Sequence, residues 1–99
     1  MRFSAAVLSV LLTSLHGATA GGAERAPAAL ANACAACHGT DGRSQGAIPT
    51  IAGMPASEFV AKMNAFGSSP GEATIMDRIT RGLSRAEIDG LASYFASLR

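Results

Sequence analysis

The chain has 99 residues, enough for one small domain, and its formal net charge of +1 is close to neutral. A nearly balanced charge argues against nucleic acid or an anionic membrane surface as a general partner. Any electrostatic docking must therefore use a local patch.

The first twenty residues have the pattern of a secretory signal peptide. A basic start precedes an apolar run over residues 5–15 that is too short to span a bilayer, and small residues follow at 18–20. We predict that residues 1–20 are a cleaved signal and that residues 21–99 are one exported, periplasmic domain without a membrane span. The alternative is an uncleaved N-terminal anchor. Three alanines fit the cleavage site: Ala20, Ala23 and Ala26.

A helix is expected soon after the predicted signal. Residues 21–26 are small and polar and predict a frayed terminus. Pro27 fits the first turn of a helix, and the alanine-rich run 28–36 continues that helix into the two cysteines. The glycines of residues 39–42 predict its end.

The stretch Cys34-Ala35-Ala36-Cys37-His38 has the pattern of a covalent c-type haem attachment site. Residues three apart on a helix are neighbours on one face, so both sulfurs can reach one edge of a porphyrin and form thioethers with its vinyl groups. His38 is then turned toward the iron. It is the only histidine after residue 20, so an imidazole ligand from this domain must be His38.

Three alternatives compete with haem attachment. A dithiol or disulfide within the motif normally starts the helix of a strand–helix–strand unit, and no strand pattern is present. A structural zinc site normally has four cysteine or histidine ligands, whereas this chain has two cysteines with one histidine beside them. The third alternative is a chance match, against which the export signal argues.

The middle of the chain predicts a loop and a second helix. Residues 43–53 contain glycine and proline without a sustained period, which indicates a loop along the haem edge. Pro55 and Ser57 mark a helix start. The helix then carries an apolar stripe formed by Phe59, Met63 and Phe66.

The last third of the chain predicts a final helix. Residues 73–82 are consistent with a loop and a short helical turn, and the capping-box pattern of residues 84–87 opens a helix that runs to about Leu98. We therefore expect an all-α domain of three to five helices around one haem. Its terminal helices should cross where three side chains meet, namely Leu30, Leu91 and Phe95.

Three methionines after residue 20 are candidates for the second iron ligand. The apolar stripe explains Met63 as a core residue, and Met54, at a helix entrance, fits a packing role or a contact with the haem edge. Met76 follows a glycine-containing stretch, which can fold across the free haem face. We predict Met76 as the ligand; its alternative interpretation is another core methionine.

With these residues the chain resembles small bacterial class I cytochromes c. The likeness is greatest to the domains of dihaem cytochromes c and to the haem subunit of flavocytochrome c sulfide dehydrogenase. The motifs that carry it are CAACHGTDG at 34–42, IPTIAGMP at 48–55 and TIMDRITRGLSRAEIDGLASYF at 74–95. This chain has one attachment motif, so it departs from the dihaem relatives.

The resemblance implies the class I cytochrome c fold and a set of haem-binding residues. Cys34 and Cys37 would form the thioethers, and His38 and Met76 would bind the iron from its two sides. The Pro49 carbonyl would accept a hydrogen bond from the second imidazole nitrogen of His38 and fix the ring.

Charged residues give little support for a docking patch. Lys62 is the only lysine, so docking through a ring of lysines is not expected. Three arginines could form a small basic patch, but we favour a solvated helix surface on which acidic residues balance them. The arginines are Arg78, Arg81 and Arg85, and the acidic residues are Asp77, Glu87 and Asp89.

Two classes of haem protein and one class without haem follow. In the first, the protein is a periplasmic electron carrier that cycles between Fe(III) and Fe(II), catalyses no bond chemistry itself and meets redox protein partners. It is either a free shuttle or the haem subunit that accepts electrons from a sulfide-oxidising flavoprotein. The alternative is a ligand-binding or catalytic haem protein with an open or displaceable sixth site. That class normally uses a distal donor, which we do not find. A dithiol module without haem would be colourless.

Overall fold

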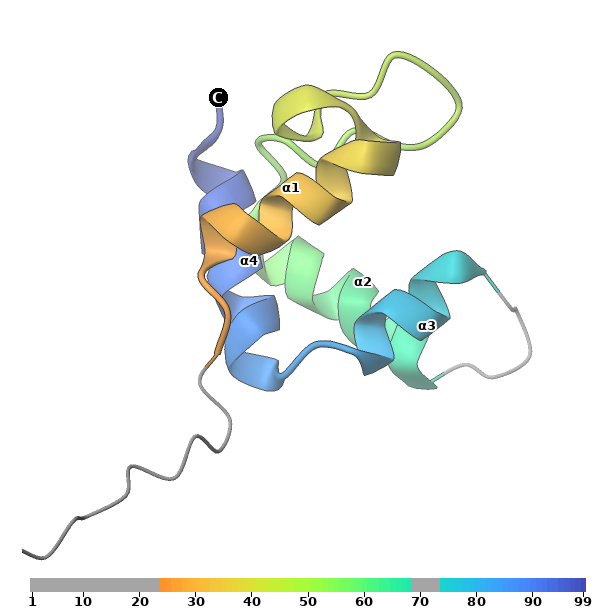
Figure 1. Ribbon diagram of the computed structural model, residues 1–99, viewed down its shortest axis with the longest axis vertical. Coiled ribbons are helices and arrows are strands. Elements are labelled where there is room, and N and C mark those ends of the chain that lie inside the picture. Colours follow the sequence, from red (N-terminus) through yellow and green to blue (C-terminus); the bar gives the residue numbers. More distant parts are fainter. Residues whose placement is uncertain (1–23, 69–73) are drawn as a thin grey trace, which may run out of the picture.

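The computed structural model describes residues 24–68 and 74–99, which fold into four α-helices and one short 3-10 helix (Figure 1). Neither range contains a strand, so the predicted all-α class is confirmed. The predicted signal over residues 1–20 lies outside the described residues. The elements are α1 (Pro27–His38), η1 (Thr40–Gly42), α2 (Ala56–Ser68), α3 (Ile75–Arg81) and α4 (Arg85–Ser97).

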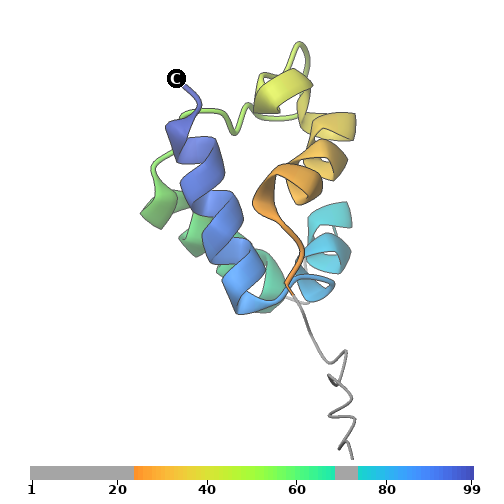
Figure 2. The same cartoon turned by 60° about the vertical axis from the view of Figure 1, so that its left-hand side comes forward.

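Helices α1 and α2 both pack against α4 (Figures 1 and 2). Leu91 and Phe95 are each only 1% exposed, and Leu30 of α1 belongs to the same buried cluster. The Phe95 ring stacks on Phe59 of α2 with 5.9 Å between centroids. Burying such side chains contributes about 1.5–3 kcal/mol each. The predicted crossing of the terminal helices is therefore confirmed.

Helix α2 buries its predicted stripe, with Phe59 and Met63 inside and Phe66 half-buried. Met63 also receives a contact from the next helix, because the Thr80 hydroxyl donates to its Sδ atom at 3.8 Å. This contact and the 5% exposure of Met63 agree with its interpretation as a core methionine.

Helix α3 is more regular than predicted. Where the sequence indicated a loop with a helical turn, the chain forms a seven-residue helix that packs on α2. Asp77 and Thr80 are buried, and the Gly82 N–H closes the helix by donating to the Ile79 carbonyl at 3.0 Å. Burial against α2 stabilises a segment whose own length is too short for a stable isolated helix.

The start of α4 has the predicted capping box. The Ser84 hydroxyl accepts from the Glu87 N–H, and the Glu87 carboxylate accepts from the Ser84 N–H, both at 3.0 Å. The predicted frayed terminus is wrong at Arg25, because its guanidinium pairs with Glu87 at 2.8 Å. Residues 21–23 of that prediction lie outside the described residues.

Candidate functional site

The last turn of α1 carries both cysteines and the histidine. Helix α1 extends to His38 and is capped by Gly39, as the glycines of residues 39–42 predicted. Cys34 and Cys37 therefore lie three apart on one helix, and both thiols are free. Cys34 is half-buried and packs against the core, while Cys37 is exposed. Burial raises the pKa of the Cys34 thiol.

Glycine ends this helix directly after His38. The Gly39 N–H donates to the Ala35 carbonyl at 3.0 Å, and the backbone of Gly39 has a φ of 85°. A Cβ atom on Gly39 would lie 2.1 Å from the Arg43 carbonyl oxygen, so no other residue fits there without a backbone shift. The chain thus reverses at once into η1.

The loop after η1 is closed at its base by one carbonyl. The Gly42 oxygen accepts from the N–H groups of Ile51 at 2.8 Å and Ala52 at 3.1 Å. Gly42 has a φ of 77°, and a Cβ there would lie 2.9 Å from the Phe95 ring. This closure anchors residues 43–50 on α4 and fixes where Pro49 lies.

The loop brings the Pro49 carbonyl to the histidine. The His38 Nδ1 atom lies 2.6 Å from the Pro49 carbonyl oxygen. A carbonyl oxygen can only accept, so the hydrogen bond requires the proton on Nδ1. The Nε2 atom then keeps its lone pair, which is the form in which imidazole binds a metal.

Met76 lies on the first turn of α3 beside exposed apolar side chains. It is half-buried and packs against the core, while Ile75 and Ile79 are 63% and 42% exposed. Helical spacing places Ile79 next to both Ile75 and Met76 on the surface of α3. Ile48, the neighbour of Pro49, is also exposed. In both views α3 and the last turn of α1 lie on the same side of α4 (Figures 1 and 2).

These residues fit a covalently bound haem c. The two free thiols on one helix turn suit the edge of the haem. The imidazole, with its other nitrogen hydrogen-bonded, suits the iron. The apolar side chains beside Met76 suit the flat apolar surface of the haem. The zinc alternative finds no support: within residues 24–68 and 74–99, no three His, Cys, Asp or Glu residues cluster as a metal site.

Comparison with protein families gives the same result. The family model described as Cytochrome c matches residues 23–99. This chain belongs to the cytochrome c family. As a member it binds one covalent haem c and transfers electrons, and the four α-helices of the described residues agree with the family assignment.

Three relatives show the range of proteins to which this cytochrome c is similar. The cytochrome subunit of sulfide dehydrogenase from Chlorobaculum tepidum is 36% identical over 70% of this chain and 63% of its own length. Cytochrome c-554(548) from Halomonas halodenitrificans is 34% identical over 65% of this chain and 82% of its own. A thiosulfate dehydrogenase electron acceptor from Stutzerimonas stutzeri is 38% identical over 66% of this chain.

The matched region covers different shares of these relatives. The matched region spans less than two thirds of the Chlorobaculum subunit and 32% of the Stutzerimonas protein. The similarity to those two proteins therefore concerns one cytochrome domain. None of the helices in the described parts of the chain is long and apolar enough to cross a bilayer.

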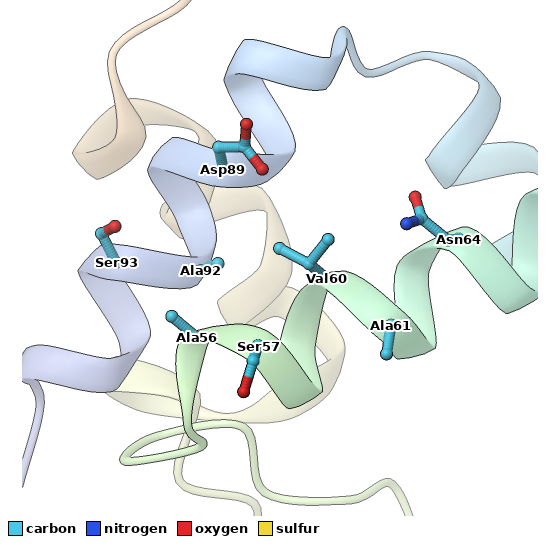
Figure 3. A pocket seen from close by; sticks show the side chains of 8 residues that line it. All are labelled: Ala56, Ser57, Val60, Ala61, Asn64, Asp89, Ala92 and Ser93. Atoms are coloured by element: carbon cyan, nitrogen blue, oxygen red, sulfur yellow. The ribbon is translucent and has the colours of Figure 1, made fainter.

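A groove of this cytochrome c is lined by residues outside the attachment motif. It is a shallow groove of about 460 Å³ between α2 and α4 (Figure 3). Its lining holds no cysteine, histidine or methionine, so it is separate from the haem-binding residues. The lining includes Ala56, Val60, Asn64, Asp89 and Ala92.

The predicted charge balance around α3 is wrong for two of its three acidic residues. Asp77 and Glu87 are 4% and 6% exposed, so they do not lie on the surface beside the arginines. Only Asp89 is exposed as expected. The exposed charges of residues 74–88 are accordingly all positive, and they belong to Arg78, Arg81 and Arg85.

Proposed function

We propose that this protein is a periplasmic one-electron carrier in which His38 and Met76 bind the haem iron and Cys34 and Cys37 form the thioethers. The observation that carries the proposal is the 2.6 Å contact between His38 Nδ1 and the Pro49 carbonyl. Because it occupies one imidazole nitrogen, it leaves Nε2 available to a metal and holds the ring in one orientation.

The bound haem supplies the Fe(III)/Fe(II) couple. The chain's own residues keep the iron ligands fixed, so that their positions change little when the iron gains or loses an electron. The Pro49 carbonyl orients His38 and makes the imidazole a stronger donor. The buried Phe59 and Phe95 rings behind the site keep its inner side apolar.

Met76 is supported as the second ligand by the placement of the other methionines. Met63 is 5% exposed and its sulfur already contacts the Thr80 hydroxyl. Met54 is half-buried beside Pro55, outside any helix. Met76 lies on α3 with an exposed apolar face beside it. A methionine sulfur at the iron raises the potential and fills the position that a ligand-binding or catalytic haem protein keeps open.

The source of the electrons is proposed from the relatives. Two of the similar proteins are named as electron acceptors of thiosulfate dehydrogenase, and one as the cytochrome subunit of sulfide dehydrogenase. We infer that a dehydrogenase of inorganic sulfur compounds donates electrons to this protein. A sulfide-oxidising flavoprotein is the specific candidate, with this chain as its haem subunit.

Visible spectroscopy of protein purified gently from the periplasm tests the proposal. We expect a low-spin c-type spectrum with a methionine–iron band in the oxidised form and no change when carbon monoxide is added to the reduced form. A carbon monoxide shift in the wild type would show an open sixth position and would overturn the carrier assignment. The same spectra decide the partner: flavin absorption that co-purifies with the haem supports the flavoprotein subunit, and its absence supports a free shuttle.

A further inference from the structure

One arginine joins the segment before α1 to the turn between α3 and α4. The Arg25 Nε atom donates to Glu87 Oε2 at 2.8 Å, and one terminal nitrogen donates both to Glu87 Oε1 at 3.1 Å and to the Gly82 carbonyl at 2.8 Å. The backbone N–H of Arg25 also donates to Glu87 Oε2 at 2.9 Å. We call Arg25, Gly82 and Glu87 the N-terminal clamp.

The clamp connects the two helices that carry the candidate iron ligands. Arg25 lies two residues before α1, whose last turn holds His38, and Gly82 caps the C-terminal end of α3. The main packing of α3 is on α2, whereas α1 packs on α4. Among the hydrogen bonds of residues 24–68 and 74–99, the bond from Arg25 to Gly82 is the one that links the α1 side to the end of α3.

Glu87 is well suited to anchor this connection. It is buried, and the capping box already holds its carboxylate, since Oε1 accepts from the Ser84 N–H at 3.0 Å. A carboxylate fixed on a rigid helix end can orient the planar guanidinium, whose remaining N–H then reaches the Gly82 carbonyl. The clamp therefore holds Arg25 through the first turn of α4.

We propose that Arg25 is a positioning residue for Met76. It fixes the C-terminal end of α3 relative to α1 and so limits how readily the Met76 sulfur leaves the iron. The inference rests on the proposed function, because it requires Met76 to be the ligand. Its consequence is kinetic: when the clamp is removed, α3 swings away more often and an external ligand enters the sixth position faster.

The experiment measures how fast imidazole replaces the methionine at the ferric iron of the holoprotein. We expect Arg25→Ala to accelerate the exchange about tenfold, the lower end of what a hydrogen bond between charged groups provides, because the Arg25 side chain is exposed to solvent. The exchange rate of Arg25→Lys should lie between those of the wild type and Arg25→Ala. The lysine ammonium can pair with Glu87 but lacks the forked guanidinium that also reaches Gly82.

Arg85→Ala is the matched control. Arg85 is an exposed arginine on the first turn of α4, and the described part of the chain shows no ion pair for it. This variant should exchange within about twofold of the wild type, as expected for a surface substitution. All rates are compared at a temperature at which circular dichroism shows each variant fully folded, so that global unfolding does not contribute.

The outcomes separate this inference from the proposed function. If the wild type lacks the methionine–iron band, or Met76→Ala retains it, the ligand assignment fails and the clamp has no role at the iron. If the band depends on Met76 but Arg25→Ala and Arg85→Ala exchange at the same rate, only the positioning role of Arg25 is overturned.

Discussion

The two helices that carry the candidate iron ligands are built in different ways. In α1 the cysteines and the histidine are consecutive or nearly so, and one helical turn presents all three. Helix α3 has seven residues, keeps Ile75 and Ile79 exposed and depends on α2 and on the N-terminal clamp for its place. The attachment side is therefore local in sequence, and the methionine side is assembled from distant segments.

This difference predicts where substitutions act. Changes in the last turn of α1 should decide whether haem is attached at all. Changes in or around α3 should leave the haem attached and alter its ligation, its potential or its exchange kinetics. The two experiments with the largest expected effects test that division directly, and two further experiments test the loop and the clamp that support the two sides.

The first experiment removes the attachment side. Replacing both Cys34 and Cys37 by serine should abolish covalent haem, because a hydroxyl does not form the thioether. The mass of the denatured protein should equal that of the polypeptide alone, and far-UV circular dichroism should show loss of helix, since a domain of this size needs the haem to complete its core. Haem that stayed covalently bound would contradict the assignment of these two residues.

The second experiment removes the methionine side. Met76→Ala should keep the covalent haem, open the sixth position to carbon monoxide and lower the reduction potential on the order of 0.1 V, within the span of about 0.8 V that axial ligands cover. Potentiometry and the carbon monoxide spectrum measure the change. Met63→Leu is the control: it should lose less than about 1.5 kcal/mol of stability and keep the iron ligation. The reverse pattern would identify Met63 as the ligand.

The third experiment loosens the loop that carries Pro49. Gly42→Ala should reduce the free energy of unfolding by about 1–3 kcal/mol, because the residue has a positive φ and its new Cβ would press on the Ile51 and Phe95 side chains. Gly46→Ala lies in the same loop, where a Cβ meets no atom within 4 Å, and should change stability by less than about 1 kcal/mol. Equal denaturant midpoints for the two variants would refute the tight packing of Gly42.

The fourth experiment tests the clamp by its pH dependence. The hydrogen bond from the Arg25 side chain, followed by that from the Ser84 N–H, lowers the pKa of Glu87 from 4.5 to about 2. A lowered pKa stabilises the fold above pH 4.5, and this contribution disappears as the pH falls toward 2. The stability difference between wild type and Glu87→Gln should therefore shrink over that interval.

Urea denaturation at successive pH values measures this difference. Glu58→Gln serves as the control, because Glu58 is exposed and its contact with Lys62 is 3.8 Å long. Its stability difference from the wild type should vary little with pH. If the Glu87→Gln difference were equally flat, the ionised Arg25–Glu87 pair would have no measurable role in stability.

Local patterns in the sequence determined much of this protein. The Cys-x-x-Cys-His spacing indicated a covalent haem, the capping box located the start of α4, and the apolar periods of α2 and α4 predicted an all-α domain. These features depend on side chains within a few residues of one another, so the order of residues alone reveals them. The ligand roles of Cys34, Cys37, His38 and Met76 stay predictions until the spectra and variants are measured.

Tertiary structure decided the rest. The burial of Asp77 and Glu87, the helical form of residues 75–81 and the ordering of Arg25 all depend on groups far away in the chain: Glu87 lies 62 residues after Arg25. The sequence alone does not distinguish a carboxylate that faces water from one that pairs with a guanidinium. Only the packing of α3 and α4 against the other helices removes it from the surface, because the free energy of a buried charge depends on the partner brought to it.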